Sequence, residues 1–150
     1  MLYAFLPSLA ALLAGTLIAI QAGINAQLAS AVGAPLGAAT ISFAVGLVAL
    51  LAAGVIGRIG LPTLQVLKEV PPYLLVTGGL LGAIFVFSSI VLAPRLGSGA
   101  LVALVVTGQL LAALVLDQFG LAGFPEHALS PGRALGAVLL IAGVVLVRFV

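Results

Sequence analysis

Five long apolar segments follow one another along this chain, and they determine what it can fold into. About 20 apolar residues are enough to cross the hydrocarbon of a bilayer as a helix, which satisfies every backbone N–H and C=O internally. The predicted helices cover approximately residues 7–30, 36–56, 73–92, 99–116 and 132–150. Of the 150 residues, 64% are hydrophobic and only 5% are charged, far from the composition of a soluble domain. We therefore predict an all-α membrane protein, with a single five-helix transmembrane domain over residues 1–150.

Prolines, glycines and charges mark the connections between these segments. Pro7 is suited to the first turn of the first helix, because its missing N–H would be unpaired there anyway. Residues 32–35 and 93–98 are predicted to be tight turns, 57–72 a short interfacial segment, and 117–132 the longest loop. An N-terminal apolar run can also be a cleavable signal. This one lacks a basic region before it and continues to a length that suits a membrane span.

The few ionisable residues exclude several classes of function. The formal charge of +2 is not gathered in a basic cluster, so nucleic-acid binding is not expected. The chain has no cysteine, and His127 stands in a predicted loop without the three or four converging ligands that a metal needs. The sequence offers no Ser/His/Asp constellation, phosphate-binding glycine loop or carboxylate pair at membrane depth. We therefore predict neither an enzyme nor a bound cofactor or metal.

The basic residues are almost equally shared between the two faces of the membrane. Five helices put Arg58, Lys68 and Arg133 on one face, and Arg95 and Arg148 on the other. Orientation follows mainly from the Lys/Arg bias of short loops, so three against two is a weak bias. Two interpretations stay open: a single fixed orientation, or insertion in both orientations. In the second case, two copies form a ten-helix antiparallel dimer with the inverted symmetry of many transporters.

Small residues recur at helix-contact spacing in three of the segments. In a bilayer, close backbone approach replaces the hydrophobic driving force that packs helices in water. The candidates for helix packing are Ala38, Ser42 and Gly46, then Gly78 with Gly82 and Gly79 with Ala83, and finally Gly136 with Gly143. We expect a compact bundle in which Gly78 and Gly82 make the closest backbone contact.

Three side-chain amides lie close together in the first apolar segment. Gln21 and Asn25 are one helical turn apart and share a face, whereas Gln27 lies on roughly the opposite face. A further amide, Gln109, lies in the middle of the fourth segment. Polar groups at this depth face the bundle interior or a hydrated cavity, so they either bind substrate or bond neighbouring helices together. The candidate substrate-binding residues are Gln21, Asn25, Gln109, Thr107 and Ser89, with packing as the alternative role for the serines and for Gln27.

Asp117 is the one acid that adjoins the end of an apolar segment. It lies at the C-terminus of its predicted helix, where the macrodipole disfavours a negative charge, and Arg133 across the loop is a suitable partner. Two roles are open for Asp117: a cap or anchor at the membrane interface, or coupling or gating. No ionisable residue lies near the middle of any segment, so a tightly held permanent cation is not expected as the substrate.

Three motifs carry a resemblance to a known family. They are QAGIN at 21–25, APRLG at 93–97, and GQ at 108–109 followed by DQFG at 117–120. With them, nearly the whole chain resembles the YdcZ-like family of short five-span bacterial inner-membrane proteins, a branch of the drug/metabolite transporter superfamily related to EamA proteins. The resemblance implies a helical fold related to half of a ten-helix transporter, function in antiparallel pairs, and a place in the inner membrane. It implies no particular substrate.

These observations together predict a small secondary transporter of the drug/metabolite type. It would move a small neutral or weakly polar organic solute by alternating access, with a second, oppositely oriented copy of itself and the lipid bilayer as partners. The alternative is a non-transporting or accessory membrane subunit that needs a different partner chain. A passive channel is a third class. Saturable uptake with counterflow would exclude a channel.

Overall fold

The computed structural model describes the backbone of residues 2–149 and the side chains of residues 5–149. Over this range the chain forms α-helices and one short 3₁₀ helix, with no strand. Five of the helices are long and apolar enough to cross a membrane, which confirms the predicted all-α membrane architecture. The chain divides into two compact units, residues 1–95 and 96–150, and each is described by itself. That all five helices form one domain therefore stays a prediction.

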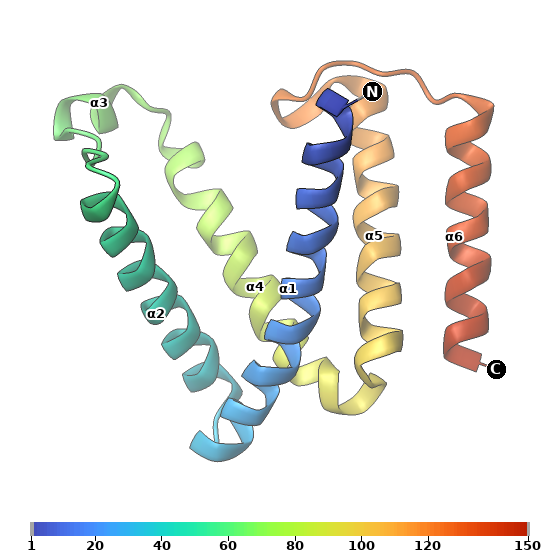
Figure 1. Cartoon of the computed structure of the whole chain (residues 1–150), viewed down its shortest axis with the longest axis horizontal. Helices are drawn as coiled ribbons and strands as arrows, with labels where there is room; N and C mark the ends of the chain where they lie inside the picture. Colours follow the sequence, from blue (N-terminus) through green and yellow to red (C-terminus); the bar gives the residue numbers. More distant parts are fainter. Residues whose placement is uncertain (1, 150) are drawn as a thin grey trace. The chain divides into compact units, whose positions relative to one another are not determined.

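The first unit is built from four helices (Figure 1). They are α1 (Leu2–Val32), α2 (Pro35–Ile56), the short α3 (Leu64–Glu69) and α4 (Pro72–Leu96). Gly33, with φ of +72°, makes the sharp turn from α1 into α2. The 57–72 connection contains α3, whose N-terminus is capped by the hydroxyl of Thr63 accepting from the backbone N–H of Val66 at 3.4 Å.

The second unit contains a helical hairpin. Its elements are α5 (Ser98–Phe119), the 3₁₀ turn η1 (Leu121–Gly123) and α6 (Pro131–Phe149). Figure 1 shows α5 and α6, the last two spans of the chain, side by side, and the two helices contact each other. With 19 residues, α6 is about 28 Å long, close to the thickness of the hydrocarbon.

Two predictions about proline are wrong. Pro7 does not begin α1 but lies inside it, because the helix starts at Leu2. Pro94 likewise lies inside α4, so residues 93–98 are not a turn. One residue, Gly97, separates α4 from α5, and its φ is +77°. A proline near a helix end removes one hydrogen bond, whereas a left-handed φ requires glycine, so the break falls on Gly97.

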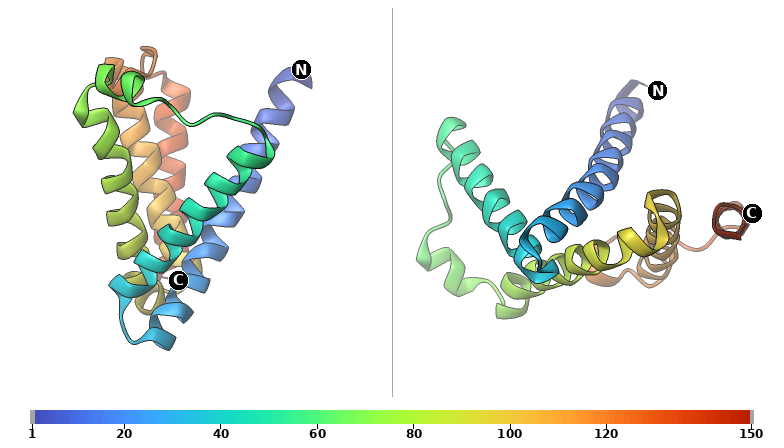
Figure 2. Two further views of the ribbon diagram at one scale, coloured as in Figure 1. Left: turned by 90° about the vertical axis from the view of Figure 1, so that its left-hand side faces the viewer. Right: turned by 90° about the horizontal axis from the view of Figure 1, so that it is seen from below.

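The core of the first unit lies next to the turn between α1 and α2. It consists of Ala29, Ala38, Ala39 and Ile90, with Leu28 and Val86 packed against it. The three alanines let the helices approach closely, as expected for packing in lipid. Away from the turn α1 and α2 diverge, as the right-hand view of Figure 2 shows. Ala38 is fully buried, Ser42 half-buried and Gly46 exposed, so burial along this stripe of α2 falls with distance from the turn.

Of the predicted packing glycines, Gly82 on α4 lies against a side chain of α2, whereas Gly46 and Gly78 have open space within the first unit. A Cβ built on Gly46 or Gly78 meets no atom within 4 Å, and one on Gly82 meets only the ring of Phe43, at 3.6 Å. Within the first unit, the small residues that pack together are alanines beside the turn, and a close backbone contact at Gly78 and Gly82 stays a prediction for the assembled bundle.

In the second unit, the buried residues of α6 lie one position after the glycines predicted to pack. Gly136 and Gly143 also have open space where a Cβ would stand. The buried residues of α6 are instead their immediate neighbours, Ala137 and Val144. One residue turns a helix by about 100°, so the face of α6 that packs within this unit is not the face that carries Gly136. These glycines remain candidates for contact with another chain.

Candidate functional site

The two amides of α1 that share a face have different environments. Asn25 is buried, with 6% of its surface exposed, and its Nδ2 donates a hydrogen bond to Oγ of Ser42 on α2 at 3.2 Å. Gln21, one turn earlier, is exposed. It lies about 16 Å from the Val32 end of the helix, so it falls at hydrocarbon depth. In α1, one amide therefore bonds two helices together, and the other remains open to a ligand.

A narrow crevice lies between α1 and α4 beside these amides. Its volume is about 10 Å³, enough for a single water molecule. The polar residues lining it are Gln21, Asn25 and Ser89, so the structure brings together three of the predicted substrate-binding residues. The hydroxyl of Ser89 donates to the carbonyl of Phe85 in its own helix at 2.8 Å. The crevice is too small for an organic solute, and its polar groups suit a bound water.

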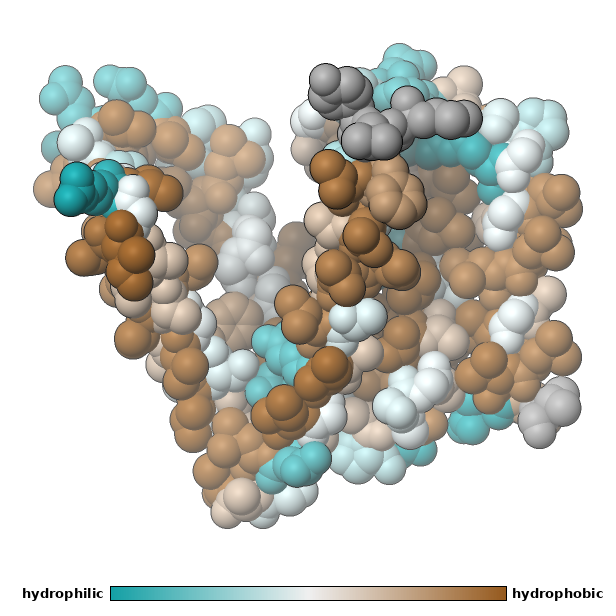
Figure 3. Space-filling view, viewed as in Figure 1, coloured by the Kyte–Doolittle hydropathy of each residue, from teal (hydrophilic) through white to brown (hydrophobic). Residues whose placement is uncertain are grey.

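A larger cavity opens between α1 and α2 on the other side of Gln21. We call it the α1–α2 cavity. Its volume is about 350 Å³, and the residues lining it are Gln21, Ser42, Phe43, Gly46, Leu47, Leu50 and Val86. Figure 3 shows the first unit hollowed between α2 and α1, with mostly apolar surface on both sides. All seven residues belong to the first unit, so this cavity does not depend on the second.

Gln109 and Thr107, the remaining candidates for substrate binding, lie on α5 in the second unit. Gln109 is exposed, whereas Thr107 is half-buried and its hydroxyl donates to the carbonyl of Ala103 at 2.8 Å. Neither residue lines the crevice or the α1–α2 cavity. Their participation in one site with Gln21 and Asn25 stays a prediction.

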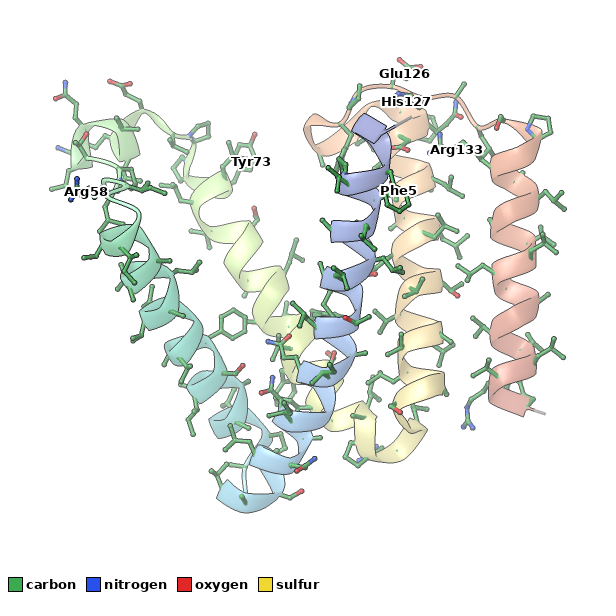
Figure 4. The ribbon with its side chains drawn as sticks, in the orientation of Figure 1. Phe5, Arg58, Tyr73, Glu126, His127 and Arg133 are labelled. Carbon is green, nitrogen blue, oxygen red and sulfur yellow. The ribbon has the colours of Figure 1, made fainter. Side chains whose placement is uncertain are left out.

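The predicted pairing of Asp117 with Arg133 is confirmed. The guanidinium of Arg133, at the start of α6, forms a salt bridge with the carboxylate of Asp117 in the last turn of α5. Arg133 also donates to the carbonyl of His127, whose own N–H donates to the carbonyl of Asp117 at 2.7 Å. Figure 4 labels Arg133 and His127 in this connection. The pair thus fastens the loop across the end of the hairpin, an arrangement that suits an interfacial cap.

The sequence alone did not indicate two residues of the cavity's surroundings. The sequence predicts Ser42 only as a packing residue, because its hydrogen bond to Asn25 depends on how α1 and α2 pack against each other. Phe43 was not singled out. It is the one aromatic residue of α2, a signal that was present, and it contributes to the cavity wall and approaches Gly82.

Comparison with known proteins fits these features. Residues 6–146 match the model of a family described as "Putative inner membrane exporter, YdcZ". This chain belongs to the YdcZ family. It is 44% identical over 69 residues to the inner membrane protein YdcZ of Escherichia coli strain K12, a match that covers 46% of each chain and so about half the length of that relative. No solved structure matches the chain.

Membership of the YdcZ family agrees with the architecture. Together with the five membrane-length helices, it makes this chain a multi-pass protein of the inner membrane. The family description places its members in membrane transport in general, without a substrate. Among the described residues, no group of three or more histidine, cysteine, aspartate or glutamate side chains could hold a metal ion.

The bond between Asn25 and Ser42 predicts a structural role for Asn25. Asn25→Ala should lower the free energy of unfolding by about 0.6–1.7 kcal/mol, the range of interhelical hydrogen bonds in membranes. Ser42→Ala should have a similar effect, and the double variant should lose less than the sum because both single changes break the same bond. Unfolding of the purified protein in mixed micelles measures all three. Gln21→Ala is the control and should unfold like the unchanged chain. If the losses of unfolding free energy from Asn25→Ala and Ser42→Ala added strictly in the double variant, the two side chains would not be hydrogen-bonded.

Proposed function

We propose that this protein is a small secondary transporter of the drug/metabolite type, which carries a small neutral or weakly polar organic solute by alternating access. The observation that supports this most directly is the α1–α2 cavity, which exposes the Gln21 amide at hydrocarbon depth. An amide offers both donors and acceptors and can therefore bind a polar group without burying a charge. The volume of the α1–α2 cavity, about 350 Å³, falls within the range of small-molecule sites.

The distribution of charge supports a neutral solute. The ionisable residues of the five long helices lie within three residues of a helix end: Arg95, Asp117, Arg133 and Arg148. A carboxylate or histidine at mid-depth, the usual partner of a proton or a permanent cation, is absent from these helices. Asp117 is engaged by Arg133 at the membrane edge, and we assign it a capping role ahead of coupling or gating.

We further propose that the working unit is an antiparallel homodimer. The nearly even distribution of basic residues permits insertion in both orientations, and two inverted copies would supply the ten helices of an inverted-repeat transporter. Each helix also leaves much of its surface uncovered, including the faces that carry Gly78 and Gly136. A second copy in the opposite orientation would give these small residues a helix to pack against.

Transport is tested with the purified chain in liposomes. A thermal-shift screen of metabolites first identifies compounds that stabilise the folded protein. Those compounds should then enter protein-containing liposomes saturably, and unlabelled compound inside the liposomes should accelerate exchange. Non-saturable uptake would indicate a channel. Stabilising compounds that never cross would instead indicate an accessory subunit, and either result would refute the proposed transporter.

Dimer orientation is tested by thiol labelling, since the chain contains no cysteine of its own. Ser98→Cys at the start of α5 and Ala128→Cys after its end place exposed thiols on opposite faces of the membrane. With dual insertion, an impermeant maleimide should label a fraction of each variant in intact cells, and the remainder only after permeabilisation. Labelling of one variant entirely from outside and the other entirely from inside would show a single orientation and refute the antiparallel homodimer.

A further inference from the structure

We infer that the α1–α2 cavity binds amphipathic solutes with an apolar body and one hydrogen-bonding group, and that Gln21 contacts that group. This inference rests on the proposed function and narrows its substrate class. It also assigns different roles to the paired amides of α1, with Gln21 as the ligand-binding residue and Asn25 as a structural residue.

The walls of the cavity define the apolar part of the solute. Phe43, Leu47 and Leu50 from α2 and Val86 from α4 supply most of the lining, and no charged residue is among them. An apolar cavity of about 150 Å³ takes up a benzene molecule in another protein. A volume of about 350 Å³ therefore has room for a body the size of two fused rings. The ring of Phe43 provides a surface against which a flat body can stack.

Gln21 defines the hydrogen-bonding part of the solute. Among the described residues, no hydrogen bond occupies its amide, although the side chain lies at hydrocarbon depth. An amide without a protein partner keeps its donors and its acceptor available to a ligand. The amide consequently favours any occupant of the cavity that carries a hydroxyl, carbonyl or amino group. The hydroxyl of Ser42, the other polar group of the lining, is already engaged by Asn25.

Asn25 does not contribute to this cavity. It lines the small crevice between α1 and α4 and is absent from the lining of the larger space. Its side chain is buried, and one of its two N–H groups is used by the bond to Ser42. Asn25 fixes the spacing of α1 and α2 beside the cavity, so it is a positioning residue.

The test compares two probes of the same size on the full chain in lipid nanodiscs. 2-Naphthol carries one hydroxyl on a fused apolar body, and naphthalene lacks the hydroxyl. Equilibrium dialysis measures both, with empty nanodiscs subtracted. Gln21→Leu should weaken 2-naphthol binding by about three- to tenfold, as expected for the loss of one hydrogen bond, and leave naphthalene binding unchanged. Gln27→Leu removes an exposed amide of the same helix outside the cavity and should affect neither probe.

A second variant tests the cavity without changing α1. Gly46 lines the cavity and has open space where a Cβ would stand, so Gly46→Leu should be accommodated by α2 and occupy part of the space. Its side chain should weaken binding of both probes while the protein keeps its thermal stability. Unchanged binding of 2-naphthol in Gly46→Leu, or in Gln21→Leu, would overturn the inference.

Three further outcomes separate this inference from its alternatives. If Gly46→Leu dissociates the dimer and leaves 2-naphthol binding intact, the space is filled by the second copy, and the inference is wrong. If 2-naphthol binds with the predicted dependence on Gln21 but no screened compound crosses liposomes, the binding site stands and the proposed transport fails. Saturable flux of a screened compound without any Gln21-dependent binding would leave the transporter standing and refute the site.

Discussion

The hydrogen bond from Asn25 to Ser42 joins α1 and α2 beside the turn between them, and the geometry of the first unit depends on it. Around this bond the side chains are small or apolar, and the fully buried Ala38 allows close approach. Farther along α2 the side chains facing α1 are larger, and the helices diverge around the α1–α2 cavity. A unit closed at one end and open at the other can bind a solute and change its opening with little repacking of its core.

Charged side chains of the long helices lie only near the helix ends, because burying a charge in the hydrocarbon of the bilayer is costly. The salt bridge of Asp117 with Arg133 closes the α5–α6 hairpin at one end, and Arg148 lies at the other end of α6. Between such ends, the polar chemistry of the spans comes from amides and hydroxyls. Most hydroxyls bond within their own helix, as Ser89 and Thr107 do. A free amide such as Gln21 is then the strongest recognition element available to a neutral solute.

The sequence predicts the helices well because hydrocarbon thickness fixes their length and composition. It also predicts that Asp117 pairs with Arg133, since opposite charges flank one short loop. The fate of each amide was not predictable, because Gln21 and Asn25 lie on one face and only the position of Ser42 on another helix distinguishes them. Packing faces were equally uncertain, because Gly136 and buried Ala137 are neighbours in sequence but differ by about 100° around α6.

We expect α1 and α2 to stay fixed beside their turn and to move relative to each other elsewhere as a solute binds. Spin-label distances in nanodiscs test it directly, using cysteine pairs at Leu12 and Leu51, far from the turn, and at Gln27 and Thr40, near it. All four side chains are exposed. 2-Naphthol should shift or narrow the distance distribution of the far pair and leave that of the near pair unchanged. A far pair that does not respond to saturating 2-naphthol, or a near pair that shifts as much, would contradict it.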